Sequence, residues 1–214
     1  MKLARLHNKG QQTEPIWPVQ LAVLVAIGLQ LSLNSSLTFG PRYVIPAIEL
    51  VLLFALAALR PGTRETWQRL RHTIAIVLIA LVSVANIVSL VAVIDALFHS
   101  SHITGRELIV SGLIIYLTNV IIFGLWYWEL DNGERVKRDF LFPQMTAGED
   151  ATKQPGWKPY FFDYLYVSVT NATAFSPTDA MPLTRRAKLL MTSQSMISLI
   201  TIALVAARAV NILS

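Results

Sequence analysis

Long apolar runs separated by short polar segments dominate the chain. The runs cover residues 16–33, 43–59, 73–98, 107–128 and 188–212. Each run is close to the ~20 residues with which an α-helix crosses the hydrocarbon core of a bilayer. Aromatic residues such as Trp17 and Trp126 lie at their ends, as in the interfacial belts of membrane proteins. The pattern predicts an all-α membrane protein with about five transmembrane helices.

One further apolar stretch is too short to be another span. Residues 160–175 are rich in aromatic side chains, but they also include Asp163, Asn171 and Thr173. A length below ~20 residues predicts one short re-entrant or interfacial helix before the last span.

The order of these segments divides the chain into three expected parts. They are an N-terminal tail (1–15), a three-helix membrane region (16–106) and a C-terminal unit (107–214). The C-terminal unit is expected to contain a helix, a solvated loop (131–159), a hairpin (160–184) and the final helix. Proline, glycine and mixed charges mark the loop.

Composition favours a lipid environment. Hydrophobic residues make up 54% of the chain and charged residues 14%, and the mean hydropathy is +0.52. A soluble domain carries about 25% charged residues. The net charge is +5, but the basic residues flank the apolar runs, so we interpret them as orientation signals rather than as a nucleic-acid interface. Cysteine is absent, which excludes disulfides and thiolate metal sites.

The distribution of basic residues predicts an orientation. Lysine and arginine collect in the N-terminal tail and in the segments 60–71, 135–158 and 185–188. With the spans given above, these segments all lie on one side of the membrane. The other side has Arg42 and Arg106, with Arg208 near the end of the last span. Because short loops rich in Lys and Arg stay in the cytoplasm, we expect a cell-membrane protein with a cytoplasmic N-terminus and a hairpin that enters from the cytoplasm.

The hairpin carries the most informative motif. Aromatic residues from Tyr164 onward lead into a hydroxyl-rich segment, then into Asp179-Ala180-Met181-Pro182-Leu183-Thr184 and a basic, apolar span. This order resembles the pore helix, filter and inner helix of potassium channels, whose filter pattern is T-x-G-Y-G-D-x-x-P-x-T. The D-x-x-P-x-T end matches, and Thr173 falls near the threonine that opens the filter. The resemblance extends from about residue 116 to the C-terminus and implies that the unit 107–214 is channel-like.

The chain departs from the potassium-channel pattern at the filter itself. Phe175, Ser176, Pro177 and Thr178 stand in place of the glycines. Potassium filters align backbone carbonyls around the ion, glycine permits the dihedral angles that this needs, and proline fixes its own φ. The expected entry from the cytoplasm resembles the inverted pore hairpin of glutamate-receptor channels.

The resemblance implies a homo-oligomer that surrounds a shared axis and conducts monovalent cations. Thr173, Ser176 and Thr178 would line a constriction beside Phe175, and Asp179 would favour cations at its mouth. A non-conducting membrane scaffold or accessory subunit is the alternative, because the same Pro and Asp residues suit a turn before a new helix.

The whole chain also resembles an uncharacterised family of bacterial multi-pass membrane proteins. The stretches LWYWEL at 125–130, DFLFPQM at 139–145 and the tail 163–212 carry this resemblance. It implies a membrane protein over nearly the full length and supplies no established activity.

A polar stripe follows the last span. Gln194, Ser198 and Thr201 share one helical face through their i, i+4, i+7 spacing. Such a face can line an ion pathway. Hydroxyl and amide side chains also form hydrogen bonds between membrane helices, each worth about 0.6 kcal/mol. The spacing alone leaves both interpretations open.

Two ionisable residues lie inside the predicted spans, where an unpaired charge is expensive. Glu49 lies about two turns, and Arg208 about one turn, from the outer ends of their spans. This similar depth predicts a buried ion pair, either structural or part of a gate or proton site.

Signals for other chemistry are weak. Asp95, His99 and His102 have i, i+4, i+7 spacing, but the spacing supplies no fourth ligand, so we expect no metal site and no cofactor. The chain has no Walker A loop, nucleophile elbow, His-Glu-x-x-His motif or dinucleotide fingerprint, so no enzyme activity is expected. The expected partners are bilayer lipids, further copies of the chain and monovalent cations.

Overall fold

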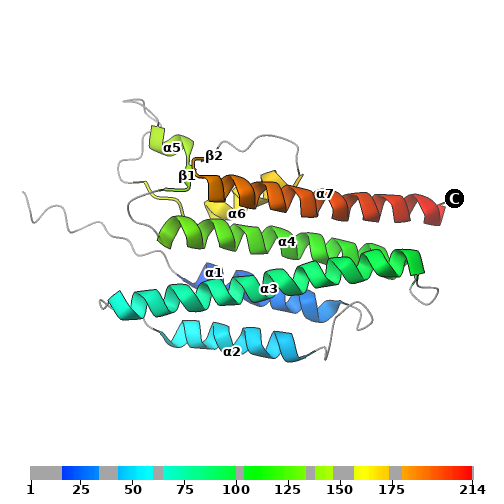
Figure 1. The fold of residues 1–214 in the computed structure, drawn as a ribbon, viewed down its shortest axis with the longest axis horizontal. Helices are drawn as coiled ribbons and strands as arrows, with labels where there is room; N and C mark the ends of the chain where they lie inside the picture. Colours follow the sequence, from blue (N-terminus) through cyan, green and yellow to red (C-terminus); the bar gives the residue numbers. More distant parts are fainter. Residues whose placement is uncertain are drawn as a thin grey trace, which may run out of the picture.

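A computed structural model describes residues 16–33, 43–59, 65–99, 104–133, 138–146, 157–173 and 180–213. The helices run alongside one another in a bundle (Figure 1). The elements are α1 (Trp17–Ser32), α2 (Val44–Ala58), α3 (Glu65–His99), α4 (Gly105–Gly133), β1 (Phe140–Leu141), α5 (Pro143–Thr146), α6 (Phe161–Thr173), β2 (Met181–Pro182) and α7 (Arg185–Leu213).

Three helices are long and apolar enough to cross a membrane. These segments are Thr66–His99 of α3, Gly105–Asp131 of α4 and Arg185–Val210 of α7. The apolar helices α1 and α2 are shorter, with 16 and 15 residues. Their lengths correspond to about 24 and about 23 Å, against a hydrocarbon core of about 30 Å. The prediction of an all-α membrane protein is confirmed in part: the described residues are mostly helical, with three candidate membrane spans and two shorter apolar helices.

The long helices extend beyond the apolar runs that predict them. α3 begins at Glu65 rather than near Thr73, α4 continues to Gly133, and α7 begins at Arg185. The added turns are polar. A membrane helix can continue into the headgroup region and water, so an apolar run marks the part inside the hydrocarbon and not the ends of the helix.

α4 is the central helix of the bundle. It packs against α1, α3, α6 and α7, whereas α2 packs against α1 and α3. Of the three long helices, α4 is the most buried and α7 the least. α1, α3, α6 and α7 begin at the end of the bundle where α2 and α4 finish, and α2 and α7 lie on opposite sides (Figure 1).

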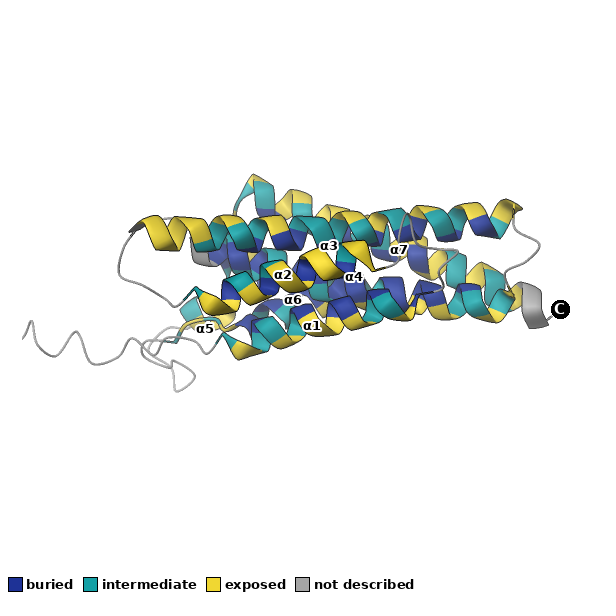
Figure 2. Ribbon diagram, turned by 90° about the horizontal axis from the view of Figure 1, so that it is seen from below, coloured by how far each residue is buried: buried dark blue, intermediate teal, exposed yellow. Residues whose placement is uncertain are grey.

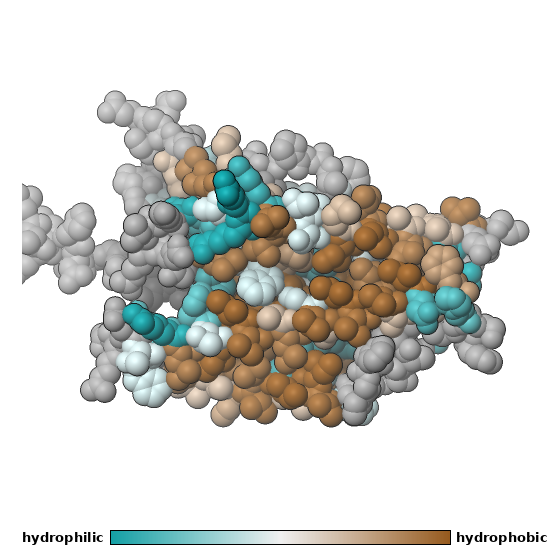
Figure 3. Space-filling view, viewed as in Figure 1, coloured by the Kyte–Doolittle hydropathy of each residue, from teal (hydrophilic) through white to brown (hydrophobic). Residues whose placement is uncertain are grey.

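The outside of the bundle is apolar. Buried residues line the inner faces of the helices, and exposed residues face outward (Figure 2). Large apolar side chains are more than half exposed on every long side of the bundle, including Phe54, Val84, Leu113 and Leu199. Figure 3 shows one face as a broad hydrophobic surface over the helices. A contiguous apolar surface of this kind marks contact with lipid or another protein, because water does not favour it.

Aromatic rings pack together at the polar end of the bundle, which is the end where α4 finishes and α6 begins (Figure 1). The ring centroids are 5.1 Å apart for Tyr127 and Phe140, 5.3 Å for Phe142 and Tyr164, and 5.6 Å for Phe142 and Trp157. Aromatic pairs at these separations contribute beyond the area they bury. They dock β1 and the residues around it onto α4 and α6.

Candidate functional site

α6 is a short helix held between two long ones at one end of the bundle. Near its start, the Tyr164 hydroxyl donates to Asp131 Oδ2 at the end of α4, at 2.5 Å. Near its other end, Asn171 Nδ2 donates to the Met191 carbonyl at 2.9 Å and to Gln194 Oε1 at 2.8 Å. Gln194 is about two and a half turns into α7. The 13 residues of α6 therefore reach only about a third of the way along α7.

Asp139 anchors the base of this arrangement. Its carboxylate is 1% exposed and accepts a hydrogen bond from Arg186 Nη2 at 2.8 Å. Arg186 Nε also donates to its two oxygens, at 2.9 and 2.8 Å. The Thr184 hydroxyl also donates to it. The Leu183 N–H donates to the Asp139 carbonyl at 2.8 Å, and β1 pairs antiparallel with β2. The segment after α4 is thereby tied to the start of α7.

Gln194 occupies the centre of the contact between α4, α6 and α7. It is fully buried. Its oxygen accepts from the Tyr127 hydroxyl at 2.5 Å and from Asn171 Nδ2 at 2.8 Å. Its nitrogen donates to the Ser168 carbonyl at 2.9 Å and to Ser168 Oγ at 2.6 Å, and Ser168 Oγ donates to the Val120 carbonyl at 2.6 Å. The amide thus makes the two donor and two acceptor contacts that its chemistry allows.

The rest of the polar stripe also faces inward. Asn119 Nδ2 of α4 donates to Ser198 Oγ at 2.9 Å, and the Thr201 hydroxyl donates to the Ile197 carbonyl at 2.8 Å. Ser198 and Thr201 are each 1% exposed. Gln194, Ser198 and Thr201 therefore share a face, as the spacing predicts, but this face packs inside the protomer. Gln194 and Ser198 form hydrogen bonds to neighbouring helices there, which is one of the two interpretations that the spacing leaves open.

Part of the filter-like segment lies outside the described residues. Thr173 is the last residue of α6, and its hydroxyl donates back to the Val169 and Thr170 carbonyls, both at 3.1 Å. Phe175, Ser176, Thr178 and Asp179 lie outside the described residues.

The structure does not bring Glu49 and Arg208 together. Glu49 is buried on α2, within hydrogen-bond distance of Gln30 of α1. Arg208 is on α7, beside a cavity of about 10 Å³, and its Nε has no partner among the described residues. α2 and α7 are on opposite sides of the bundle (Figure 1). The expected ion pair is not formed, because equal depth does not fix the direction in which each helix faces.

Sequence reasoning missed two contacts of α4 with α3. His72 Nδ1 lies 2.6 Å from Glu129 Oε1, and Trp126 Nε1 donates to Ser83 Oγ at 3.0 Å. The signal was present in Glu129, an acidic residue among aromatic residues at the end of a span. An ionisable residue in that position needs a partner.

Two of the three residues considered as metal ligands, Asp95 and His99, lie within the described residues. His99 Nδ1 is 3.0 Å from Asp95 Oδ1, and both side chains are about three-quarters exposed. His102 lies outside the described residues. Within the described ranges, no group of three or more His, Cys, Asp or Glu side chains is placed to hold a metal ion.

Gly124 permits the close approach of α6 to α4, and this leads to a prediction. A Cβ at Gly124 would lie 3.2 Å from the Leu165 Cα, so a Gly124→Ile side chain has to push the backbone of α6 away. Overpacking of this kind costs about 1–3 kcal/mol, which thermal unfolding in detergent would detect.

Gly28→Ile on α1 is the matched control, because nothing lies within 4 Å of a Cβ at Gly28. Its melting temperature should stay close to that of the wild type or rise. Equal melting temperatures for both variants would show that α6 does not rest on α4 at Gly124.

Comparisons with protein-family models, with curated proteins and with solved structures find no match for this chain.

Proposed function

We propose that this chain is a channel-like membrane protein whose α4–α6–α7 unit forms a cation pathway in a homo-oligomer. The observation that carries the proposal is the half-length helix α6, which starts where α4 ends and α7 begins and stops about a third of the way along α7. Pore units place such a short helix between two spans, and irregular backbone at membrane depth requires a protein or water lining. The last carbonyls of α6 carry partial negative charge toward the membrane interior, which favours a cation there.

The orientation follows from basic residues at the two ends of the bundle. The end at which α6 begins has the described residues Arg69, Arg71, Arg138, Lys158, Arg185, Arg186 and Lys188. The opposite end has Arg106 and Arg208. By the positive-inside rule, the first end is cytoplasmic. With α1 and α2 counted as spans, the chain crosses the cell membrane about five times, starts in the cytoplasm, and inserts α6 as a re-entrant helix from that side.

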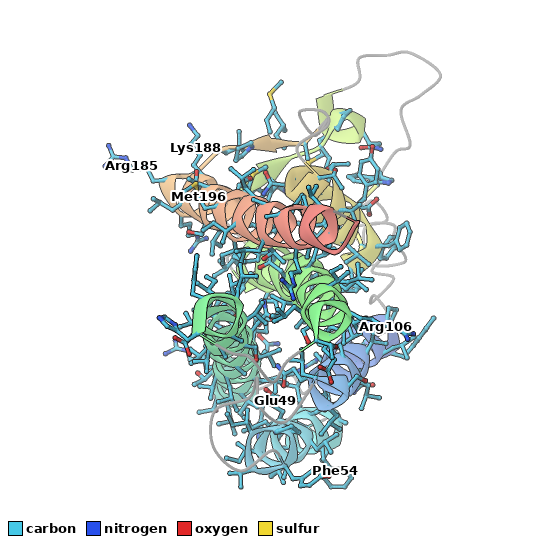
Figure 4. All side chains as sticks on the ribbon, turned by 90° about the vertical axis from the view of Figure 1, so that its right-hand side faces the viewer. Glu49, Phe54, Arg106, Arg185, Lys188 and Met196 are labelled. Carbon is cyan, nitrogen blue, oxygen red and sulfur yellow. The ribbon has the colours of Figure 1, made fainter. Side chains whose placement is uncertain are left out.

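The pathway in this proposal is bordered by the outer face of α7. Met196 lies on that face, as do Arg185 and Lys188 at the start of the helix (Figure 4). Thr192 and Ser193 are exposed on it as well. The buried stripe of Gln194, Ser198 and Thr201 then holds α7 in position, while Thr173, Phe175, Ser176, Thr178 and Asp179 are the proposed filter-like segment.

One observation favours a non-conducting scaffold or accessory subunit as the second candidate. The buried amide and hydroxyl groups of Gln194, Asn171 and Ser168 satisfy one another within the protomer. The outer face of α7 is largely apolar, with Leu189 and Leu199 more than half exposed. Such a face also suits a partner helix or lipid.

Single cysteines distinguish the two functions, because the chain has none of its own. Purified protein in liposomes is assayed for potassium, sodium and proton flux. For a pore, we expect cation flux in the wild type. A charged, membrane-impermeant thiol reagent should label Met196→Cys and reduce that flux by at least about tenfold, since a charged adduct in a narrow pore blocks conduction.

Val84→Cys is the matched control, because Val84 is exposed near the middle of α3. The reagent should leave this cysteine unlabelled, since it faces lipid. If the folded, inserted protein shows no flux and Met196→Cys is as unreactive as Val84→Cys, the scaffold is the better account.

A further inference from the structure

Glu49 is a fully buried carboxyl group in the part of the bundle that the proposed pore does not use. Its side chain is 0% exposed. Figure 4 shows Glu49 on the side of α2 that faces the bundle, whereas Phe54 of the same helix faces outward. α2 packs against α1 and α3, so the carboxyl group lies within a three-helix contact.

The position of Glu49 corresponds to the interior of the membrane. The side-chain nitrogen Nε2 of its neighbour Gln30 lies 3.5 Å from the carbonyl oxygen of Val82 on α3. Val82 lies inside the apolar run 73–98 of α3, about 14 Å from the start of this run and about 24 Å from its end. An ionised carboxylate at this depth is strongly disfavoured unless a cation or several donors stabilise it.

No basic side chain is available to Glu49 within the described ranges. α1 has no titratable residue and α2 has no other. On α3, the nearest titratable residues to Val82 are His72 and Asp95, at least about 15 Å along the helix. His72 is bonded to Glu129 of α4.

The Gln30 amide is the polar group next to Glu49, and its two orientations imply different states of the carboxyl group. With nitrogen toward α2, it lies 3.0 and 3.3 Å from the two carboxylate oxygens. With oxygen toward α2, the contact is a hydrogen bond only when the carboxyl group has a proton to donate. The second orientation leaves the nitrogen to donate to the Val82 carbonyl at 3.5 Å, so the amide links α2 to α3.

We propose that Glu49 and Gln30 form a proton-binding site in the interior of the membrane, in which neutral Glu49 donates its proton to the Gln30 side-chain oxygen. Burial, depth and the neutral amide partner all favour this form. Loss of the proton would leave a negative charge among apolar helices. Release is therefore coupled to entry of water or a cation between α2 and its neighbours, which makes α2 a proton-linked element separate from the α4–α6–α7 unit.

The test is infrared spectroscopy of the full-length protein in liposomes, near neutral pH. A protonated carboxyl group absorbs at a frequency distinct from that of a carboxylate. The wild-type spectrum minus that of Glu49→Gln should contain one protonated-carboxyl band. Glu49→Asp keeps a carboxyl group and provides a second test if Glu49→Gln does not fold. It should shift the frequency of this band. The control Glu129→Gln should leave it in place.

Two results would overturn the proposal. One is a difference spectrum with carboxylate bands and no protonated-carboxyl band, which means that Glu49 is ionised. The other is a band that disappears when sodium is added at constant pH, which assigns the site to a metal cation. Neither result depends on ion flux, so the proton site and the proposed pore are tested separately.

Discussion

Gln194→Leu should lower the free energy of unfolding by about 3 kcal/mol, one of the largest effects expected of a single change in this protein. Leucine fills a similar volume but has no polar group. The Tyr127 hydroxyl, Asn171 amide and Ser168 hydroxyl would each lose a partner that they now have at 2.5–2.8 Å. The Tyr127 hydroxyl would lose its acceptor, which costs about 1–3 kcal/mol. Asn171 and Ser168 keep the Met191 and Val120 carbonyls and each lose one hydrogen bond worth about 0.5–1.5 kcal/mol, so the losses together give about 3 kcal/mol.

The matched control is Thr201→Val, on the same buried face of α7. Thr201 donates to the Ile197 carbonyl of its own helix, so the change should cost less than about 1 kcal/mol. Thermal unfolding in detergent gives both values. Equal losses for the two variants would mean that the bonds between α6 and α7 add nothing beyond ordinary packing.

The apolar pattern predicted the helices well, because a helix in a hydrocarbon environment needs a continuous run of about 20 apolar residues. It also predicted that Gln194, Ser198 and Thr201 share a face, since the helical repeat fixes that relation. It could not predict what lies opposite that face. Glu49 and Arg208 illustrate the same limit, because hydropathy gives the depth of a residue in the membrane and not the direction in which it points.

The partners of the buried polar groups were beyond local sequence patterns. Asp139 and Arg186 are 47 residues apart, and the two strands that bring them together are only two residues long each. Tyr127 lies in an aromatic cluster that is typical of the membrane interface. The sequence therefore gave no separate indication that its hydroxyl forms a hydrogen bond with Gln194. Asn171 and Ser168 are three residues apart on a short helix, and this spacing on one face was the available clue.

The contacts separate the bundle into two regions. Asp139 ties the start of α7 to the segment after α4. Further inside the bundle, Gln194 links α7 to both α4 and α6. α7 is nevertheless the least buried of the long helices. A helix fixed on one face and open on the other is what a pore-lining or partner-binding helix requires, whereas Glu49 lies in the separate contact of α1, α2 and α3.

Asp139→Ala is expected to destabilise the protein by about 3 kcal/mol, since it removes the buried carboxylate of an ion pair. The carboxylate is 1% exposed and accepts from both Arg186 and Thr184. Arg186 is 38% exposed and recovers part of its hydration, so the effect should lie at the lower end of the range for buried pairs, about 3–5 kcal/mol. The loss is measured by thermal unfolding in detergent.

Asp95→Ala provides the comparison that separates burial from charge. Asp95 also pairs with a basic residue, His99, but both side chains are about three-quarters exposed. Exposed pairs contribute about 0–1 kcal/mol, so this variant should unfold almost as the wild type does. If Asp139→Ala were equally mild, the start of α7 would be held by β1–β2 pairing and aromatic packing alone. If only Asp139→Ala is destabilised and also loses flux, then the anchor of α7 is needed for both stability and conduction.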